Sequence, residues 1–245
     1  MVGGTTYEIK GGRTRVGGTG YGVFKGRTLV SGAGYDLGFM ATNVLGAQPE
    51  GGIVLINENG IPVEFYVAKH DYEPSLNGNG RTLVVRKDPY DQRPWDAYNV
   101  NAYASSTIDA WLNGEYRAAL DADIRYETGS TTFYYTPGNG NVVMTTLSRS
   151  VFLLSVGELC GNDRRLNTEG SVLPTAEILK FCYANGSAVR QWTRSCVLTD
   201  NTSVPQVNEF VYITNCSVSD HWSRPAFTLP SILLVDDDGY VSVAT

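Results

Sequence analysis

The stretch GGIVLINENGIPVEFYVAKH, residues 51–70, carries the clearest structural signal in this chain. Apolar and polar residues alternate on both sides of Asn57-Glu58-Asn59-Gly60. Side chains of a strand point alternately to its two faces, and Asn-Gly favours a tight turn, so the pattern predicts a β-hairpin. The segment RTLVVRKD, residues 81–88, follows a second polar turn and predicts a third strand.

A helical pattern follows these strands. In SSTIDAWLNGEYRAALDADI, residues 105–124, Ser105 or Ser106 can cap a helix, because a hydroxyl oxygen accepts the free backbone N–H groups of the first turn. We expect Gly114 to end this helix and a second short helix or turn to follow it. Strands and helices together predict an α+β fold. Further elements are expected as hairpins in 131–147 and 228–245, and as a buried strand that runs into a helical turn in 150–159.

Composition excludes several classes of protein. The chain has 245 residues, of which 42% are hydrophobic, enough to build a core. Its net charge is -6 and it has no lysine- or arginine-rich cluster, so nucleic acid is not an expected partner. No apolar run approaches about 18 residues, and MVGGTTYEIK at the start has no apolar signal-peptide core. We therefore expect neither membrane insertion nor secretion by the usual route.

The first part of the chain differs from the rest. Residues 1–38 contain 12 of the 27 glycines and carry a charge of +3, which leaves -9 for the remainder. GGTTYEIKGGRTRV (3–16) and GGTGYGVFKGRTLV (17–30) share a 14-residue period that continues into SGAGYDLGF (31–39). Tyr7, Tyr21 and Tyr35 occupy the same position of the three units.

This repeat predicts short strands joined by tight turns. A unit so small cannot bury its own apolar face and must stack on neighbours or on other copies of the chain. We expect residues 1–39 to form an all-β module for attachment or oligomerisation and residues 40–245 to form the main domain. A flexible glycine-rich leader is the alternative, but it does not predict tyrosines in register.

Beyond residue 160 the periodicity weakens, and we expect loop-rich chain anchored by aromatic residues. Several phrases in this region and before it resemble a family of tail-associated proteins of phages and prophages of Gram-positive gut bacteria. The family also opens with repeats of the GGT.Y.I..GRTLV kind. The remaining shared phrases are YASSTIDAWLN (103–113), VFLLS (151–155), NGSA (185–188), WTRS (192–195) and RPAFTLPS (224–231).

The resemblance implies a C-type-lectin-like domain, similar to the formylglycine-generating enzymes and phage tropism determinants. It implies a virion protein of the phage tail that recognises a bacterial surface protein or glycan and contacts other tail proteins. It also implies that residues 190–223 are a variable region diversified by a retroelement. We expect a homo-oligomer, with a trimer as the first expectation, because several weak sites then gain avidity.

The chain departs from the family at four positions. Gln191, Thr193 and Cys196 replace residues of the family phrase WWLRSP, and Ser223 stands where glycine is usual. Loss of the proline and the glycine changes the local loop geometry. A tolerant display surface would accept such changes.

We predict the ligand-binding surface in residues 190–223, because Tyr and Trp offer rigid contact area while Asn, Ser, Thr and Asp offer adaptable hydrogen bonds. The predicted ligand-binding residues are Gln191, Thr199, Asp200, Asn201, Asn208, Phe210, Tyr212, Thr214, Asn215, Ser217, Asp220, His221 and Trp222. The predicted framework residues, which hold the surface from within, are Trp111, Trp192, Arg194, Arg224 and Pro225. We expect the two arginines to pair with carboxylates or carbonyls in the core.

Catalytic and metal chemistry has little support. The two histidines, His70 and His221, lie outside any metalloprotease spacing, and no G-x-S-x-G motif occurs. We predict no catalytic residues, no cofactor and no metal site. Glu115, Asp121 and Asp123 could supply a carboxylate pair for glycoside hydrolysis, although a solvated helix surface explains them as well.

Two further groups of residues leave alternatives open. Cys160, Cys182, Cys196 and Cys216 match no metal motif, and buried thiols are favoured over a Cys160–Cys182 disulfide. Asp236-Asp237-Asp238-Gly239 is explained by a β-turn, with calcium as the alternative. For the whole chain we predict a receptor-binding protein; the alternatives are a tail or baseplate decoration protein without its own receptor and a carbohydrate-active enzyme.

Overall fold

The computed structural model describes residues 44–218 and 221–243 in full, together with the backbone of four strands between residues 13 and 37. These four strands form two antiparallel hairpins. Thr14 pairs with Tyr21 in the first hairpin and Thr28 pairs with Tyr35 in the second, so the pairing repeats with the same 14-residue spacing as the sequence. The prediction of short paired strands is confirmed for these segments, whereas Tyr7 lies outside the described residues. The strands are β1 (Arg13–Val16), β2 (Thr19–Gly22), β3 (Gly26–Val30) and β4 (Ala33–Leu37).

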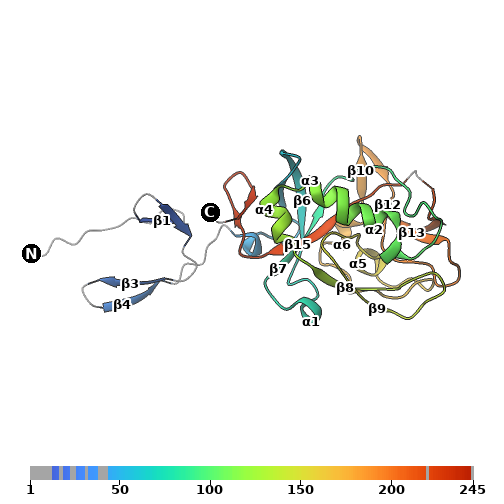
Figure 1. Cartoon of the computed structure of the whole chain (residues 1–245), viewed down its shortest axis with the longest axis horizontal. Coiled ribbons are helices and arrows are strands. Elements are labelled where there is room, and N and C mark those ends of the chain that lie inside the picture. The colour runs from blue at the N-terminus through green and yellow to red at the C-terminus, as the bar shows by residue number, and fades with distance from the viewer. Residues whose placement is uncertain are drawn as a thin grey trace, which may run out of the picture.

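A four-stranded antiparallel sheet forms the centre of the main domain, in the order β15-β7-β6-β5 (Figure 1). The predicted hairpin and third strand are confirmed, with Asn59 and Gly60 as the turn, both at positive φ. The strand β15, from the last part of the chain, pairs with β7 although about 140 residues separate them. The four strands are β5 (Ile53–Glu58), β6 (Ile61–His70), β7 (Arg81–Arg86) and β15 (Ala226–Pro230).

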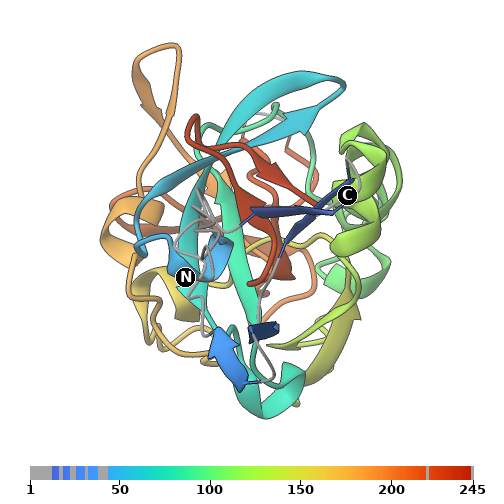
Figure 2. The same ribbon diagram turned by 90° about the vertical axis from the view of Figure 1, so that its left-hand side faces the viewer.

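Helices flank this sheet, and in Figure 2 the green segment α2–α4 and the yellow-to-orange segment α5–α6 lie on opposite sides of its strands. Ser106 caps α2, because its Oγ accepts the N–H of Asp109 at 3.2 Å. Ser155 and Glu158 form a capping box at the start of α5. The helices are α1 (Pro74–Asn77), α2 (Thr107–Trp111), α3 (Arg117–Ala119), α4 (Ala122–Glu127), α5 (Val156–Cys160) and α6 (Ala176–Leu179), with short 3-10 turns η1 (Leu45–Ala47) and η2 (Tyr103–Ser105).

The prediction that Gly114 ends the helix is wrong. The chain continues from α2 through a π-helical turn, η3 (Leu112–Tyr116), into α3. The widened turn lets the Tyr116 hydroxyl reach Glu58 Oε1 at 2.6 Å, with the Tyr116 ring against Trp111. These tertiary contacts outweigh the roughly 1 kcal/mol that an interior glycine costs a helix.

The remaining strands form small antiparallel sheets, so the domain is a mixed α+β fold built around several sheets. The 160–229 stretch is less irregular than expected, because it contains five strands before β15. The expected strand in 150–159 is instead an extended buried segment with one bridge, Phe152 to Ala226, before α5. The small sheets comprise β8 (Thr131–Tyr135) with β9 (Thr145–Arg149), β10 (Cys182–Ala184) with β11 (Ser187–Val189), β12 (Gln191–Trp192) with β13 (Ser203–Val207) and β14 (Val211–Asn215), and β16 (Leu234–Val235) with β17 (Val241–Ser242).

A buried ion pair joins the irregular segments of the core. Arg194 Nη1 donates to Glu158 Oε2 at 2.7 Å and to the carbonyl of Leu153 at 2.9 Å, and both charged side chains are inaccessible to solvent. The Tyr72 hydroxyl donates to the other Glu158 oxygen at 2.5 Å, and burial together with this carboxylate raises the Tyr72 pKa. The Arg194 guanidinium also lies 4.5 Å from the centre of the Phe133 ring.

We expect Arg194→Met to lower the free energy of unfolding by about 3–5 kcal/mol, because it leaves the Glu158 carboxylate buried without its cation. Lys87→Met is the matched control, since it removes the partly exposed Lys87–Glu64 pair and is expected to cost less than about 1 kcal/mol. Urea denaturation of both variants measures the difference. Equal effects would show that the buried pair does not hold the core.

Candidate functional site

The predicted ligand-binding residues are distributed over several environments. Two of them, Gln191 and His221, are buried, and Asp220 lies outside the described residues. The exposed members are Thr199, Asp200, Asn201, Phe210 and Ser217, and the partly buried ones are Asn208, Tyr212, Thr214, Asn215 and Trp222. The structure therefore does not bring all of them to one surface.

Gln191 and His221 are corrections to the predicted surface. The Gln191 side chain donates Nε2 to the carbonyls of Leu179 at 2.7 Å and Lys180 at 3.3 Å, which ties β12 to the end of α6. The His221 ring packs edge-on against Trp192 with ring centres 4.8 Å apart. Polar residues in an aromatic-rich stretch can satisfy buried carbonyls as readily as a ligand, and composition alone does not distinguish the two.

The loop with Thr199, Asp200 and Asn201 is fixed at a separate place. Asn101 donates its side-chain amide to three carbonyls around this loop, those of Val197, Asp200 and Ser203. Asp200 Oδ1 accepts the backbone N–H groups of the next turn. These contacts assign the loop a structural role on the side of the β8–β9 hairpin, where Gly140 lies close to Asn201.

The edge strand β14 carries an exposed aromatic cluster. Along β14, Val211 and Ile213 pack against the core, while Tyr212 alternates with them. Phe210, in the turn before β14, is 60% exposed and lies edge-on to Tyr212. The Arg190 guanidinium lies 4.0 Å from the centre of the Tyr212 ring. This arrangement, Arg190 with Phe210 and Tyr212, is called the β14 cluster below.

A groove of about 390 Å³ lies next to the backbone of Arg190. Its aromatic side chains are Tyr90, Tyr183 and Trp222, with polar groups from Asp88 and Asn185 and small residues Pro89, Ala184 and Gly186. Trp222 belongs to the predicted surface, and its backbone N–H donates to the Arg190 carbonyl at 3.0 Å. We call these eight residues the aromatic groove.

Three segments distant in sequence form the aromatic groove. One wall follows β7, another is the turn of the β10–β11 hairpin, and Trp222 precedes β15. In the hairpin turn, Asn185 and Gly186 both have positive φ, as a two-residue type I′ turn requires. The turn therefore projects Tyr183, 52% exposed, beside the groove without disturbing the strands behind it.

Arg224 holds two of these walls together. Its buried guanidinium donates to the carbonyls of Arg86 and Lys87 at the end of β7, and to those of Leu179 and Phe181 before β10. Burial lowers its pKa from the ordinary value, and four carbonyl acceptors compensate for the loss of water around the cation. The expected pairing of both framework arginines in the core agrees with the structure.

The other framework residues lie nearby. Trp192 is buried and donates Nε1 to the Arg93 carbonyl at 2.8 Å, and Pro225 is buried beside Arg224. The Trp111 ring lies tilted against that of Tyr90, a groove residue, with ring centres 5.3 Å apart, and the Arg93 guanidinium lies 3.3 Å from the centre of the Trp111 ring. The framework thus contacts the groove from behind.

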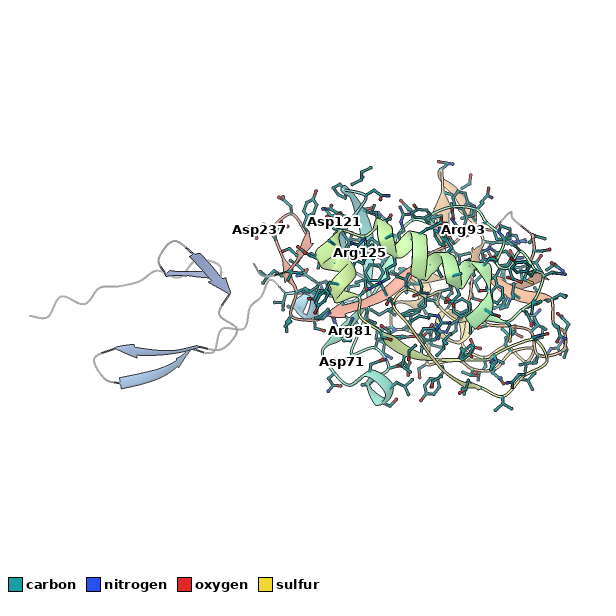
Figure 3. The ribbon with its side chains drawn as sticks, in the orientation of Figure 1. Asp71, Arg81, Arg93, Asp121, Arg125 and Asp237 are labelled. Atoms are coloured by element: carbon teal, nitrogen blue, oxygen red, sulfur yellow. The ribbon has the colours of Figure 1, made fainter. Side chains whose placement is uncertain are left out.

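The residues proposed for other chemistry lie elsewhere. Asp121 accepts a hydrogen bond from Asn57 at 3.0 Å, Glu115 and Asp123 are exposed, and none of the three lines the groove. Asp236 Oδ1 accepts the N–H groups of Asp238 and Tyr240, as a β-turn requires. In Figure 3, Asp121 and Asp237 lie at the opposite end of the main domain from Arg93. No group of three or more His, Cys, Asp or Glu that could hold a metal forms among the described residues.

Sequence reasoning missed most of the groove. Asp88, Pro89 and Tyr90 follow a strand without any linear signal of function. The phrase Tyr183-Ala184-Asn185-Gly186 did contain one, because an aromatic residue next to an Asn-Gly turn is displayed at the tip of a hairpin.

The comparisons with known proteins give a family and no function. Residues 79–231 match the family described as a domain of unknown function, DUF6273, and the chain belongs to this family. No curated protein and no solved structure matches the chain. Within the described part of the chain, we find no helix with the length and apolar character needed to cross a membrane.

All four cysteines are free thiols, so the proposed Cys160–Cys182 disulfide is not formed. Cys182, Cys196 and Cys216 are buried as expected, whereas Cys160 is exposed. Burial raises the pKa of Cys196 to about 12 and that of Cys216 to about 11.

We expect one thiol, the exposed one of Cys160, to react with Ellman's reagent in the native protein at pH 8, more slowly than a free thiol because partial burial raises its pKa. The thiolate is the reactive form, so a buried thiol with a raised pKa reacts only after unfolding. Four thiols are expected to react in denaturant. A Cys160→Ser variant that still shows a fast-reacting thiol in the native protein would contradict the assignment.

Proposed function

We propose that this chain is a non-enzymatic receptor-binding protein of a phage tail, with a C-type-lectin-like main domain that binds a bacterial surface glycan or protein through the aromatic groove and the β14 cluster. The observation that supports this proposal is the groove itself. It combines three aromatic side chains with a carboxylate and an amide on a surface whose backbone is fixed from within.

The chemistry of the groove suits a sugar in particular. The C–H faces of a pyranose ring pack on aromatic rings, and planar Asp and Asn side chains bind its hydroxyls. The β14 cluster enlarges the contact area with a partly exposed tyrosine, an exposed phenylalanine and a cation. Exposed aromatic residues of this kind are frequent hot spots of recognition.

A decoration protein without its own receptor is the second candidate. This second function is favoured if the aromatic residues of 190–223 are all buried packing residues, and Trp192 is one. Phe210 and the groove residue Tyr183 are not, since each is more than half exposed. This favours the receptor-binding function over the decoration function.

We expect Tyr183→Ala and Tyr212→Ala each to weaken binding to host cells or their isolated surface glycans about 10- to 30-fold, the range of a moderate hot spot. Tyr126→Ala is the matched control, because Tyr126 is 82% exposed on α4 outside the groove, and it is expected to bind as the unmodified protein does. Flow cytometry with fluorescent protein and a glycan array measure both. Equal binding by all variants would move the site elsewhere, and absence of binding by the unmodified protein would favour the decoration function.

We further propose that residues 1–39 assemble the chain into a trimer. Light scattering on the full chain is expected to give three times the chain mass, and a variant that starts at residue 40 is expected to be a folded monomer, because the core residues of the main domain lie between residues 45 and 241. A monomeric full chain, or a trimer that persists without these residues, would contradict the assignment.

A further inference from the structure

A second hollow lies between α1, β8 and the segment after α5. It is a cavity of about 220 Å³, open to solvent on one side and lined by Glu73, Tyr134, Met144, Thr168, Gly170 and Ser171. It shares no lining residue with the aromatic groove. We call it the Glu73 cavity.

Glu73 is the unusual member of this set. Its side chain lines the cavity, the residue is only 8% exposed, and its carboxylate accepts no hydrogen bond from any residue that the structure describes. A buried carboxylate normally has a cation or several hydrogen-bond donors beside it, because it loses the stabilisation of water. The free side of this carboxylate faces the cavity.

Neighbouring charges do not supply the missing partner. At Gly170, where φ is +90°, a Cβ atom would lie 3.3 Å from Glu158 Oε1 and 3.5 Å from Glu73 Oε1, so the two carboxylates approach the same point. The charge of Glu158 is balanced by Arg194. Glu169 lies next to this group, and its carboxylate accepts hydrogen bonds from the Thr136 N–H and the Ser195 hydroxyl.

The region around the cavity is therefore short of positive charge. Arg194 is the one buried cation that contacts this group within the described residues, and it faces Glu158 rather than Glu73. A ligand that brings a positive charge with N–H donors would complete the arrangement.

The other lining residues indicate which cation fits. The Thr168 hydroxyl donates to Asn162 and keeps its lone pairs free to accept. Tyr134 and Met144 also line the cavity, and aromatic and thioether side chains suit a cation and an alkyl chain respectively. A calcium ion needs six to eight oxygen ligands, and the cavity has one carboxylate and no cluster of metal ligands among the described residues.

We propose that the Glu73 cavity binds a primary ammonium group on a short alkyl chain, such as a free amine or a lysine side chain. The ammonium group donates to the Glu73 carboxylate and to the hydroxyl of Thr168, and the alkyl chain packs against Met144. This site is independent of the aromatic groove.

The test uses the full chain and n-butylammonium chloride as the probe, measured by calorimetry at low ionic strength. We expect saturable binding with one site per chain. Glu73→Gln keeps the size of the side chain but removes its charge, and we expect it to weaken binding at least about tenfold. The uncharged analogue 1-butanol is expected not to bind.

Two further variants separate binding in the cavity from a general effect of charge. Ser171→Trp changes an exposed residue at the cavity and is expected to block binding without altering its charge. Glu115→Gln removes an exposed carboxylate elsewhere and is expected to bind as the unmodified protein does. Thermal unfolding of each variant shows that it is folded.

Three outcomes would overturn the proposal. They are equal binding of n-butylammonium by the Glu73→Gln variant, equal binding of 1-butanol by the unmodified protein, and absence of n-butylammonium binding up to about 10 mM, the weak limit of a specific site. Calcium binding that depends on Glu73 would also overturn it, in favour of a metal site. None of these measurements depends on the receptor proposed for the groove, so the two proposals fail separately.

Discussion

The buried ion pair between Arg194 and Glu158 is the interaction on which the main domain depends. Both side chains are removed from solvent, and each is held by further groups. Removing two charges from water is costly, and only close pairing with additional hydrogen bonds offsets that cost. The segments that supply these groups must therefore meet at one point. They contain Tyr72, Leu153, Glu158 and Arg194.

Much of the chain around this point is irregular, and irregular backbone leaves carbonyl oxygens without partners in a helix or sheet. A guanidinium group has five N–H donors in one plane and can satisfy several carbonyls at once. Arg194 donates to the carbonyls of Leu153 and Tyr134, and Arg224 donates to four carbonyls. The two framework arginines therefore take the place that hydrogen bonds between strands occupy in a larger sheet.

The local elements of this fold could be predicted from sequence because their signals are local. The alternation in 51–70 predicted the β5–β6 hairpin, and Ser106 marked the start of α2. Gly114 gave a wrong prediction of the helix end. The reason is the contact between Tyr116 and Glu58, two residues about 60 positions apart in sequence, which outweighs the low helix propensity of glycine. The groove and the cavity were hidden for the same reason. Asp88, Tyr183 and Trp222 meet only through the tertiary fold, and the sequence around Glu73 does not reveal that its carboxylate faces a hollow without a hydrogen-bond donor beside it.

The residues of 190–223 divide between the interior and the surface, and composition does not show which residue lies where. Gln191 is buried and donates to carbonyls at the end of α6, whereas Trp222, which is bridged to it through the backbone, is partly exposed and lines the groove. Phe210 lies in the turn before β14 and is exposed, and Tyr212 alternates along β14 with Val211 and Ile213, which pack against the core. The same aromatic-rich segment thus supplies both buried framework residues and exposed surface residues. The position of each residue in the tertiary fold decides whether it is buried or exposed.

In this arrangement the backbone of the groove is held independently of the side chains that line it. The walls of the aromatic groove are positioned by Arg224 through backbone carbonyls, which every residue type provides. Side chains such as Tyr183 and Asn185 point away from that anchor and can change without removing an acceptor from it. Replacement of groove side chains should then leave the fold intact, whereas replacement of Arg224 should disturb it. Thr193 and Cys196 are buried and also donate to backbone carbonyls, Thr193 through Oγ1 to Pro205 and Cys196 through Sγ to Thr136.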